Sequence, residues 1–181
     1  MDAKFRVKLR EYIANISIGS STVRGRPAGT VGTVRKYLEG LDLSSLRDLK
    51  KEQFEIWLNE KTQDLQSKLT QDFKEEWGLA RKCLNIFLRN VVYNKYLFKE
   101  YNLRSILPWL EVPLDSQVAQ HLRNEHEGEG LPRWPWLNKL DQPTSKLYQD
   151  VADKVRATKE LPYRVHLDVY YWRQKPKIKI K

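Results

Sequence analysis

The sequence predicts an all-α protein, and three observations support that prediction. Apolar residues recur at intervals of three and four through most of the chain, which is the spacing of a helix face. No stretch alternates apolar and polar residues for long enough to require a sheet. Of the 181 residues, 40% are hydrophobic and 11% are aromatic, which is enough to build a core. We therefore expect one compact helical domain over residues 1–181, with a basic tail at 174–181.

The first part of the chain is predicted to hold helices separated by short breaks. Apolar spacing indicates a helix over 5–16, which ends in the polar and glycine-containing stretch NISIGSS. The following GRPAGTVG has neither a Walker lysine nor the spacing of a dinucleotide-binding loop, so it is interpreted as a turn. A short helix is expected over 31–39, and two further helices are expected within 46–69.

The longest predicted element covers 73–98 and is interrupted at Gly78. A Gly-, Pro- and Trp-rich loop is expected after residue 125, followed by helices over 145–159 and 162–173. The final KPKIKIK alternates, so it could pair as an edge strand.

The stretch PWLEVPLDSQVAQHLR predicts an extended segment that turns into a helix. Pro113 disfavours helical backbone at Val112. Asp115 or Ser116 is a good N-cap for the amphipathic run that follows. A capping role alone explains Asp115, so any chemical role must be supported by other residues.

Charge and cysteine content limit the classes of partner and site. Lys and Arg exceed Asp and Glu by ten, and the sequence pI is about 9.6, which favours a polyanion such as nucleic acid as partner. The basic residues expected to contact phosphates are Lys4, Arg6, Lys8, Arg10, Arg24, Arg26 and those of 175–181. Cys83 is the only cysteine, so an internal disulfide and a cysteine-based zinc site are excluded. The histidines lack metal-site spacing, and no apolar stretch approaches membrane-spanning length, so we expect a cytoplasmic protein without a metal.

Lys82 and Asp115 are the candidate chemical pair. Lys82 follows Gly78 near the expected start of an apolar helix, where an amine could act as a nucleophile. A carboxylate at another helix start could deprotonate that amine or stabilise a cationic sugar. The alternative is an ordinary surface lysine and a helix cap, and residue types alone favour it.

Three segments carry a resemblance to a known family: GLARKCLNIFLR, EVPLDSQVAQ and VHLDVYYWR. In this order they resemble the helix-hairpin-helix-GPD superfamily of DNA base-excision glycosylases, in which a hairpin lysine precedes an apolar helix and a PVDxxV segment supplies an aspartate. Lys82 and Asp115 are 33 positions apart, which is most similar to the archaeal 8-oxoguanine DNA glycosylase branch (AGOG). The hairpin reads EEWGLARK where the family typically has LPGVGxK, so its contacts with DNA and with a cation stay open.

The resemblance implies a two-lobed helical fold and a bifunctional glycosylase and AP lyase. It would be a monomer, associated with the nucleoid, that needs no cofactor. Its substrate would be double-stranded DNA with a damaged base, 8-oxoguanine being the first expectation. The resemblance assigns catalysis to Lys82 and Asp115. Its expected base pocket contains Asp168, Trp172, His166, Phe87 and Pro113. Its expected DNA contacts are Gly78, Arg81, Arg24, Arg26 and Arg89.

Asp168 and Trp172 are four positions apart and would share one helix face. Trp172 would stack on the flipped base, and Asp168 would accept a hydrogen bond from the N7–H of 8-oxoguanine. Two alternatives to this enzyme remain. One is a non-catalytic helical protein that binds DNA or RNA, and the other is an adaptor whose six tryptophans line a protein interface.

Overall fold

The computed structural model describes residues 2–69, 76–126 and 131–174. Within these ranges the chain forms eight α-helices and contains no strand, which confirms the all-α prediction. The α-helices are α1 (Ala3–Ser17), α2 (Thr30–Glu39), α3 (Lys51–Lys68), α4 (Trp77–Tyr93), α5 (Lys95–Glu100), α6 (Ser116–Glu125), α7 (Gln142–Thr158) and α8 (Leu167–Tyr170). The short 3₁₀ helices are η1 (Leu43–Leu46), η3 (Leu107–Trp109), η4 (Leu137–Lys139) and η5 (Arg164–His166).

The observed helix boundaries differ from the prediction at three places. The 46–69 region holds one long α-helix, α3, preceded by η1. The break in the long apolar segment falls at Asn94, because the Asn94 side chain accepts hydrogen bonds from two backbone amides and caps α5. Gly78 instead lies in the first turn of α4. At 162–173 the chain forms only η5 and the four-residue α8. The predicted helical residues 73–75 and the tail 175–181 lie outside the described residues.

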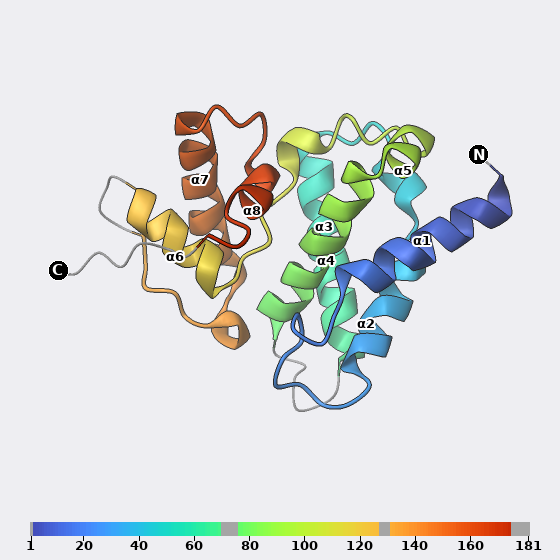
Figure 1. Ribbon diagram of the computed structural model, residues 1–181, viewed down its shortest axis with the longest axis horizontal. Coiled ribbons are helices and arrows are strands. Elements are labelled where there is room, and N and C mark those ends of the chain that lie inside the picture. The colour runs from blue at the N-terminus through green and yellow to red at the C-terminus, as the bar shows by residue number, and fades with distance from the viewer. Residues whose placement is uncertain (1, 70–75, 127–130, 175–181) are drawn as a thin grey trace.

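Two clusters of buried hydrophobic side chains organise the helices. The larger cluster joins α1 to α5 and includes Phe54 and Phe87. The smaller cluster joins α6, α7 and α8 around Tyr148. Leu137 of η4 packs against both clusters. Helix α4 lies between the two groups of helices, with α1 and α2 on one side and α6 to α8 on the other (Figure 1).

The central position of α4 follows from its sequence. Eleven of its seventeen residues are buried, among them side chains on several faces of the helix. A helix that is apolar over most of its circumference has to be surrounded by other elements. The side chains along its remaining stripe are therefore placed where the two groups of helices meet. None of the described helices combines the length and apolar character needed to cross a membrane.

Candidate active site

The start of α6 is fixed by Asp115. Its Oδ1 accepts hydrogen bonds from the backbone amides of Gln117 and Val118, each at 3.0 Å, so Asp115 is the N-cap. The extended segment before it is held by the side-chain amide of Gln149. That amide donates to the Val112 carbonyl at 2.9 Å and accepts from the Val112 N–H at 3.0 Å. The carboxylate of Asp115 therefore has a fixed position relative to α7.

Lys82 lies opposite this carboxylate. The Nζ of Lys82 is 3.4 Å from Oδ2 of Asp115, the oxygen that is not used in the cap. The side chains retain 13% and 34% of their accessible surface, so the pair is sheltered but can be reached from solvent. The structure thus brings together the two residues that the sequence selected. Lys82 is the sixth residue of α4, which places it in the second turn of that helix.

A buried ion pair sets the register of the two segments that carry this pair. Arg81 precedes Lys82, and it binds both carboxylate oxygens of Glu111, at 2.8 and 2.9 Å. Arg81 also donates to the Thr62 hydroxyl, and Asn85 donates to Glu111. Burial alone would raise the pKa of Glu111, but Arg81 and Asn85 hold that pKa below its usual range. Because Glu111 is four residues before Asp115, this bidentate contact fixes Asp115 against α4.

The Lys82–Asp115 pair lines an open pocket of about 610 Å³. Two loop segments form the rest of its wall, namely 21–26 and 134–139. These segments contribute the cations Arg24, Arg26 and Lys139 and the aromatic side chains Trp134 and Trp136. The pocket therefore combines a primary amine and a carboxylate with positive charge and large apolar surfaces.

Gly78 allows the 134–139 segment to approach α4. A Cβ at this position would lie well inside contact distance of the Leu137 carbonyl oxygen and 2.8 Å from the Leu140 Cβ. Gly78 is buried beneath these residues, so the expected DNA contact by Gly78 is corrected to a close-packing role. The residue still matters for the site because it sets the distance between α4 and the pocket wall.

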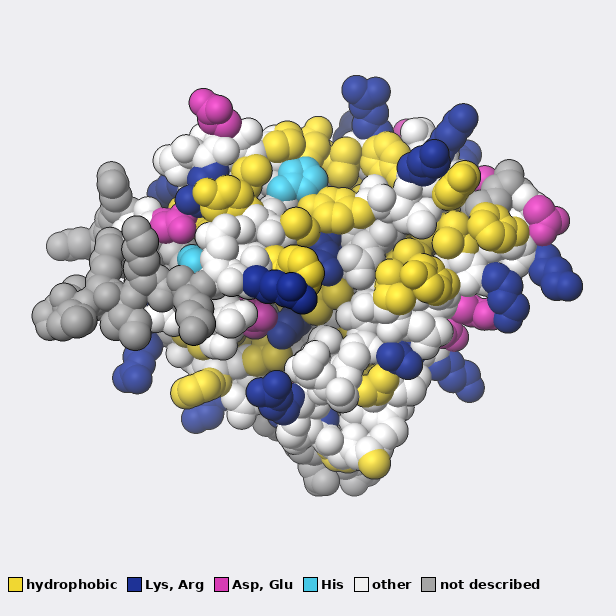
Figure 2. Space-filling model, viewed as in Figure 1, with side chains coloured by type: hydrophobic (Ala, Val, Ile, Leu, Met, Phe, Trp, Pro, Cys, Tyr) yellow, Lys and Arg dark blue, Asp and Glu magenta, His cyan; other side chains and the backbone are white. Residues whose placement is uncertain are grey.

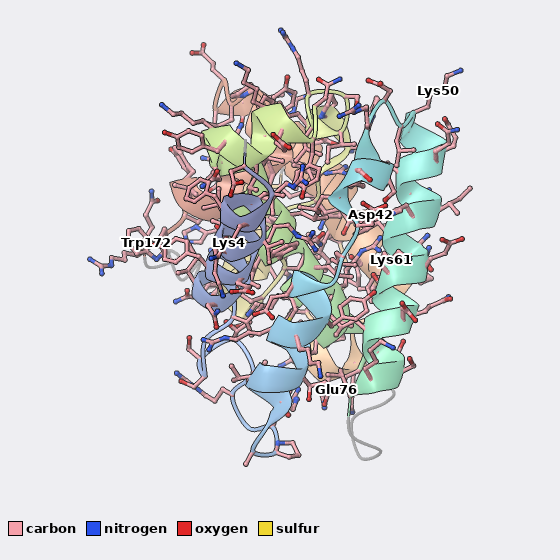
Figure 3. The ribbon with its side chains drawn as sticks, turned by 90° about the vertical axis from the view of Figure 1, so that its right-hand side faces the viewer. Lys4, Asp42, Lys50, Lys61, Glu76 and Trp172 are labelled. Carbon is pink, nitrogen blue, oxygen red and sulfur yellow. The ribbon has the colours of Figure 1, made fainter. Side chains whose placement is uncertain are left out.

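Several predicted DNA-contacting cations are paired within the protein. Arg81 is only 6% exposed and is used in the contact with Glu111, so it is not a surface cation. Arg89 forms an ion pair with Asp168, and burial lowers the pKa of Arg89. Arg26 binds Glu76, whose position at the lower end of the molecule is labelled in Figure 3. Arg24 is exposed at the pocket and is free of these internal roles.

Most basic residues of α1 also form ion pairs or hydrogen bonds within the protein. Arg6 pairs with Glu100 and Lys8 pairs with Glu11. Arg10 donates to two backbone carbonyls at the C-terminal end of α2, those of Glu39 and Leu41. Lys and Arg are spread over the visible face with Asp and Glu between them (Figure 2). The basic tail at 175–181 lies outside the described residues.

The residues expected in the base pocket occupy different surroundings. Asp168 contacts Arg89 of α4, as described above. His166 receives a 2.6 Å contact at Nδ1 from the Tyr93 hydroxyl, and the two rings are stacked with centroids 5.5 Å apart. Trp172 is 68% exposed and projects at the side of the molecule opposite to α3 (Figure 3).

The other two expected pocket residues are buried. Phe87 is inaccessible in the larger cluster, because its side of α4 faces α1 to α3 rather than the pocket. Pro113 is buried in the extended segment before Asp115. None of the five expected base-pocket residues lines the pocket that contains Lys82.

Sequence reasoning missed Trp134, Trp136 and Lys139 as pocket residues. The available signal was the unusual density of Trp and Pro in a loop, which was interpreted only as a connection. Their arrangement depends on the packing of that loop on Gly78, which sequence spacing does not reveal. Among the described residues, no group of three or more His, Cys, Asp or Glu side chains is arranged to hold a metal ion. Comparison of the chain with protein-family models, curated proteins and solved structures finds no match.

Proposed function

We propose that the protein is a DNA glycosylase with associated AP lyase activity, which excises a damaged base from duplex DNA in the cytoplasm. The observation that carries the proposal is the 3.4 Å approach of Lys82 to Asp115 at the wall of a pocket. A primary amine and a carboxylate at this separation can pass a proton directly, and both remain accessible to a sugar that enters the pocket. The helix-hairpin-helix-GPD fold belongs to the same proposal.

The division of roles follows from the two oxygens of Asp115. Oδ1 is committed to the cap of α6, while Oδ2 faces Lys82. Asp115 accepts a proton from Lys82 as Nζ attacks C1′ of the damaged nucleotide. The glycosidic C1′–N bond breaks, and the base leaves with the bonding electron pair and takes up a proton.

The lyase step then proceeds through an imine. The C1′–O4′ bond opens, O4′ is protonated, and Nζ and C1′ form the Schiff base. Loss of a C2′ proton expels the 3′ phosphate, which breaks the C3′–O bond and nicks the strand. Water hydrolyses the imine and returns the free lysine. Asp115 passes the proton that it accepted from Lys82 to the departing base, and as a carboxylate again it stabilises the positive charge of the Schiff base.

We place recognition of the base along α4. Lys82 and Arg89 are seven positions apart, so they lie on one stripe of the helix, about 10 Å apart along its axis. Arg89 forms an ion pair with Oδ2 of Asp168 beside that stripe. Asp168 does not line the pocket that contains Lys82, so recognition by Asp168 requires the base to extend along α4 beyond that pocket. A carboxylate acceptor there favours 8-oxoguanine, which has an N7–H, over guanine, which does not.

Borohydride trapping tests the proposal. Wild-type protein is incubated with duplexes that each carry one modified base, including 8-oxoguanine, and sodium borohydride reduces the imine to a stable amine. We expect a covalent protein–DNA band with at least one lesion and its loss in Lys82→Gln, while Lys82→Gln still binds duplex DNA. A Lys82→Gln protein that is trapped as well as the wild type would remove Lys82 from the mechanism.

A non-catalytic nucleic-acid-binding protein is the second candidate, and the cap of α6 favours it. Because Oδ1 alone gives Asp115 a complete structural role, the Lys82–Asp115 contact also fits an ordinary ion pair. Asparagine caps helices as well as aspartate does, so Asp115→Asn should be silent for this candidate. For the glycosylase, the same variant should lose about 10²- to 10⁴-fold in excision rate while its melting temperature changes little.

A further inference from the structure

A second pocket lies in the groove between α2 and α3. Its volume is about 710 Å³, and it shares no residue with the pocket that contains Lys82 and Asp115. Figure 3 views this side of the molecule and labels Asp42 and Lys61, which both line the pocket, where the two helices lie side by side. Sites for small organic molecules have volumes of about 300–1,000 Å³, so the groove is large enough for such a ligand.

Two aromatic side chains, Tyr37 of α2 and Trp57 of α3, form the apolar part of this pocket. The Tyr37 hydroxyl donates to the Lys61 carbonyl at 3.0 Å and lies 3.4 Å from a carboxylate oxygen of Asp64. Burial raises the pKa of Tyr37, so the hydroxyl keeps the proton that it donates. The Nε1–H of Trp57 donates to the Ser45 hydroxyl at 3.0 Å. Because these contacts fix both rings and use their N–H and O–H groups, the rings offer apolar surface to a flat ligand.

Three lysines, Lys36, Lys61 and Lys68, line the same pocket. Within residues 2–69, 76–126 and 131–174, none of the three forms an ion pair. Lys68 Nζ lies 5.9 Å from the centroid of the Tyr37 ring. Lys36 and Lys68 are exposed, whereas Lys61 is half-buried. An anionic group of a ligand would therefore be best sheltered from water at Lys61.

Two carboxylates limit the negative charge that the pocket can accept. Asp42 caps η1 and accepts a hydrogen bond from the Ser44 N–H at 2.9 Å, and Asp64 lies beside Tyr37. Both carboxylates line the pocket, so its side chains carry an excess of one positive charge. A nucleic-acid backbone would meet repulsion from these carboxylates, but a single anionic group is balanced. We propose that the groove binds a small, flat aromatic molecule with one negative charge, its ring against Tyr37 and Trp57 and its anionic group at Lys61. This inference does not depend on the proposed glycosylase activity.

Isothermal titration calorimetry with two probes of the same shape tests the charge requirement. The probe 2-naphthoate is a flat aromatic monoanion, and 2-naphthamide is its neutral counterpart. We expect wild-type protein to bind naphthoate saturably, and naphthamide about 3- to 10-fold more weakly, the effect of losing one partly exposed ionic contact. Lys61→Gln should weaken naphthoate binding by the same factor and leave naphthamide binding unchanged. Lys154→Gln, which removes an exposed lysine of α7, should bind both probes as wild type does.

Two variants at Tyr37 test the aromatic wall. Tyr37→Leu removes the ring and should weaken binding of both probes by about 2- to 12-fold, the effect of losing one aromatic contact. Tyr37→Phe keeps the ring and should bind both probes as wild type does, and thermal melting of both variants verifies that they fold. Equal affinity of wild-type protein for the two probes would overturn the inference, as would naphthoate binding that Lys61→Gln leaves unchanged. An excess of undamaged duplex DNA should not displace naphthoate, and displacement would contradict a site that is separate from bound DNA.

Discussion

Replacing Gly78 by alanine tests whether close packing of α4 against η4 builds the pocket. The added Cβ would collide with the Leu137 carbonyl oxygen and would lie 2.8 Å from the Leu140 Cβ. The Leu137 carbonyl oxygen belongs to the backbone, so it cannot rotate away as the end of a flexible side chain can. We therefore expect the 137–140 segment to be displaced from α4, together with the pocket wall that includes Trp136 and Lys139.

The net cost can be worked from two opposing terms. Alanine is better than glycine in a helix by about 1 kcal/mol. Forcing an extra methyl group into a packed contact costs about 1–3 kcal/mol, and a backbone obstacle belongs at the upper end. The free energy of unfolding should thus fall by about 2 kcal/mol. For a chain of this length that corresponds to a melting temperature lower by about 4–8 °C.

Gly32→Ala is the matched control. Gly32 lies in α2, and a Cβ there would meet no atom within 4 Å. This change should raise the free energy of unfolding by up to about 1 kcal/mol, because only the helix preference acts. Thermal and urea unfolding measure whether the free energy of unfolding falls in Gly78→Ala and rises in Gly32→Ala. If Gly78→Ala is as stable as Gly32→Ala, the packing argument is wrong, and so is the account of the pocket wall that depends on it.

Three further predictions follow from the site. The double variant Arg24→Gln/Lys139→Gln should lower the slope of log affinity against log salt by about 0.9 for each lost phosphate contact, measured on duplex DNA; an unchanged slope would mean that these side chains do not bind phosphate. Burial lowers the pKa of His166 from 6.5, so the unfolded chain binds the proton more readily. The free energy of unfolding should therefore decrease as the pH falls through 6.5 toward the lowered pKa, and less steeply in His166→Gln, whereas parallel curves would show that His166 does not contribute. Asp168→Asn should reduce the selectivity of excision for 8-oxoguanine over guanine, and full selectivity would place base recognition elsewhere.

Helix positions were largely predictable because they depend on local patterns. The apolar spacing located α1, α2, α6 and α7 to within a few residues. The break in the long apolar segment was misplaced because glycine was given more weight than asparagine. In the structure, the cap formed by Asn94 ends the run, and Gly78 is accommodated in α4 by a tertiary contact. A tertiary contact of this kind leaves no periodic pattern in the sequence.

The candidate site was predictable only where a motif marked it. Lys82 and Asp115 were found from two short segments, and the structure places their side chains in contact. It was harder to predict which Lys and Arg side chains contact DNA, because the sequence does not show which of them pair with a carboxylate of the same chain. Arg81 and Arg89 were expected at DNA, but each neutralises a carboxylate from a distant segment. Such pairs follow from the fold, and spacing in the sequence does not reveal them.

The buried ion pair of Arg81 with Glu111 also explains how the neighbouring Lys82–Asp115 pair is kept together. A surface arginine at this position would leave the segment before α6 without its bidentate contact to α4. The bidentate contact with Glu111 fixes the orientation of that segment as well as its distance from α4, because two parallel hydrogen bonds join the same two side chains. Lys82 and Asp115 extend from the same two backbone segments, one residue and four residues away. The buried pair therefore holds the accessible Lys82–Asp115 pair in register, in addition to the cap contacts that fix Asp115 itself.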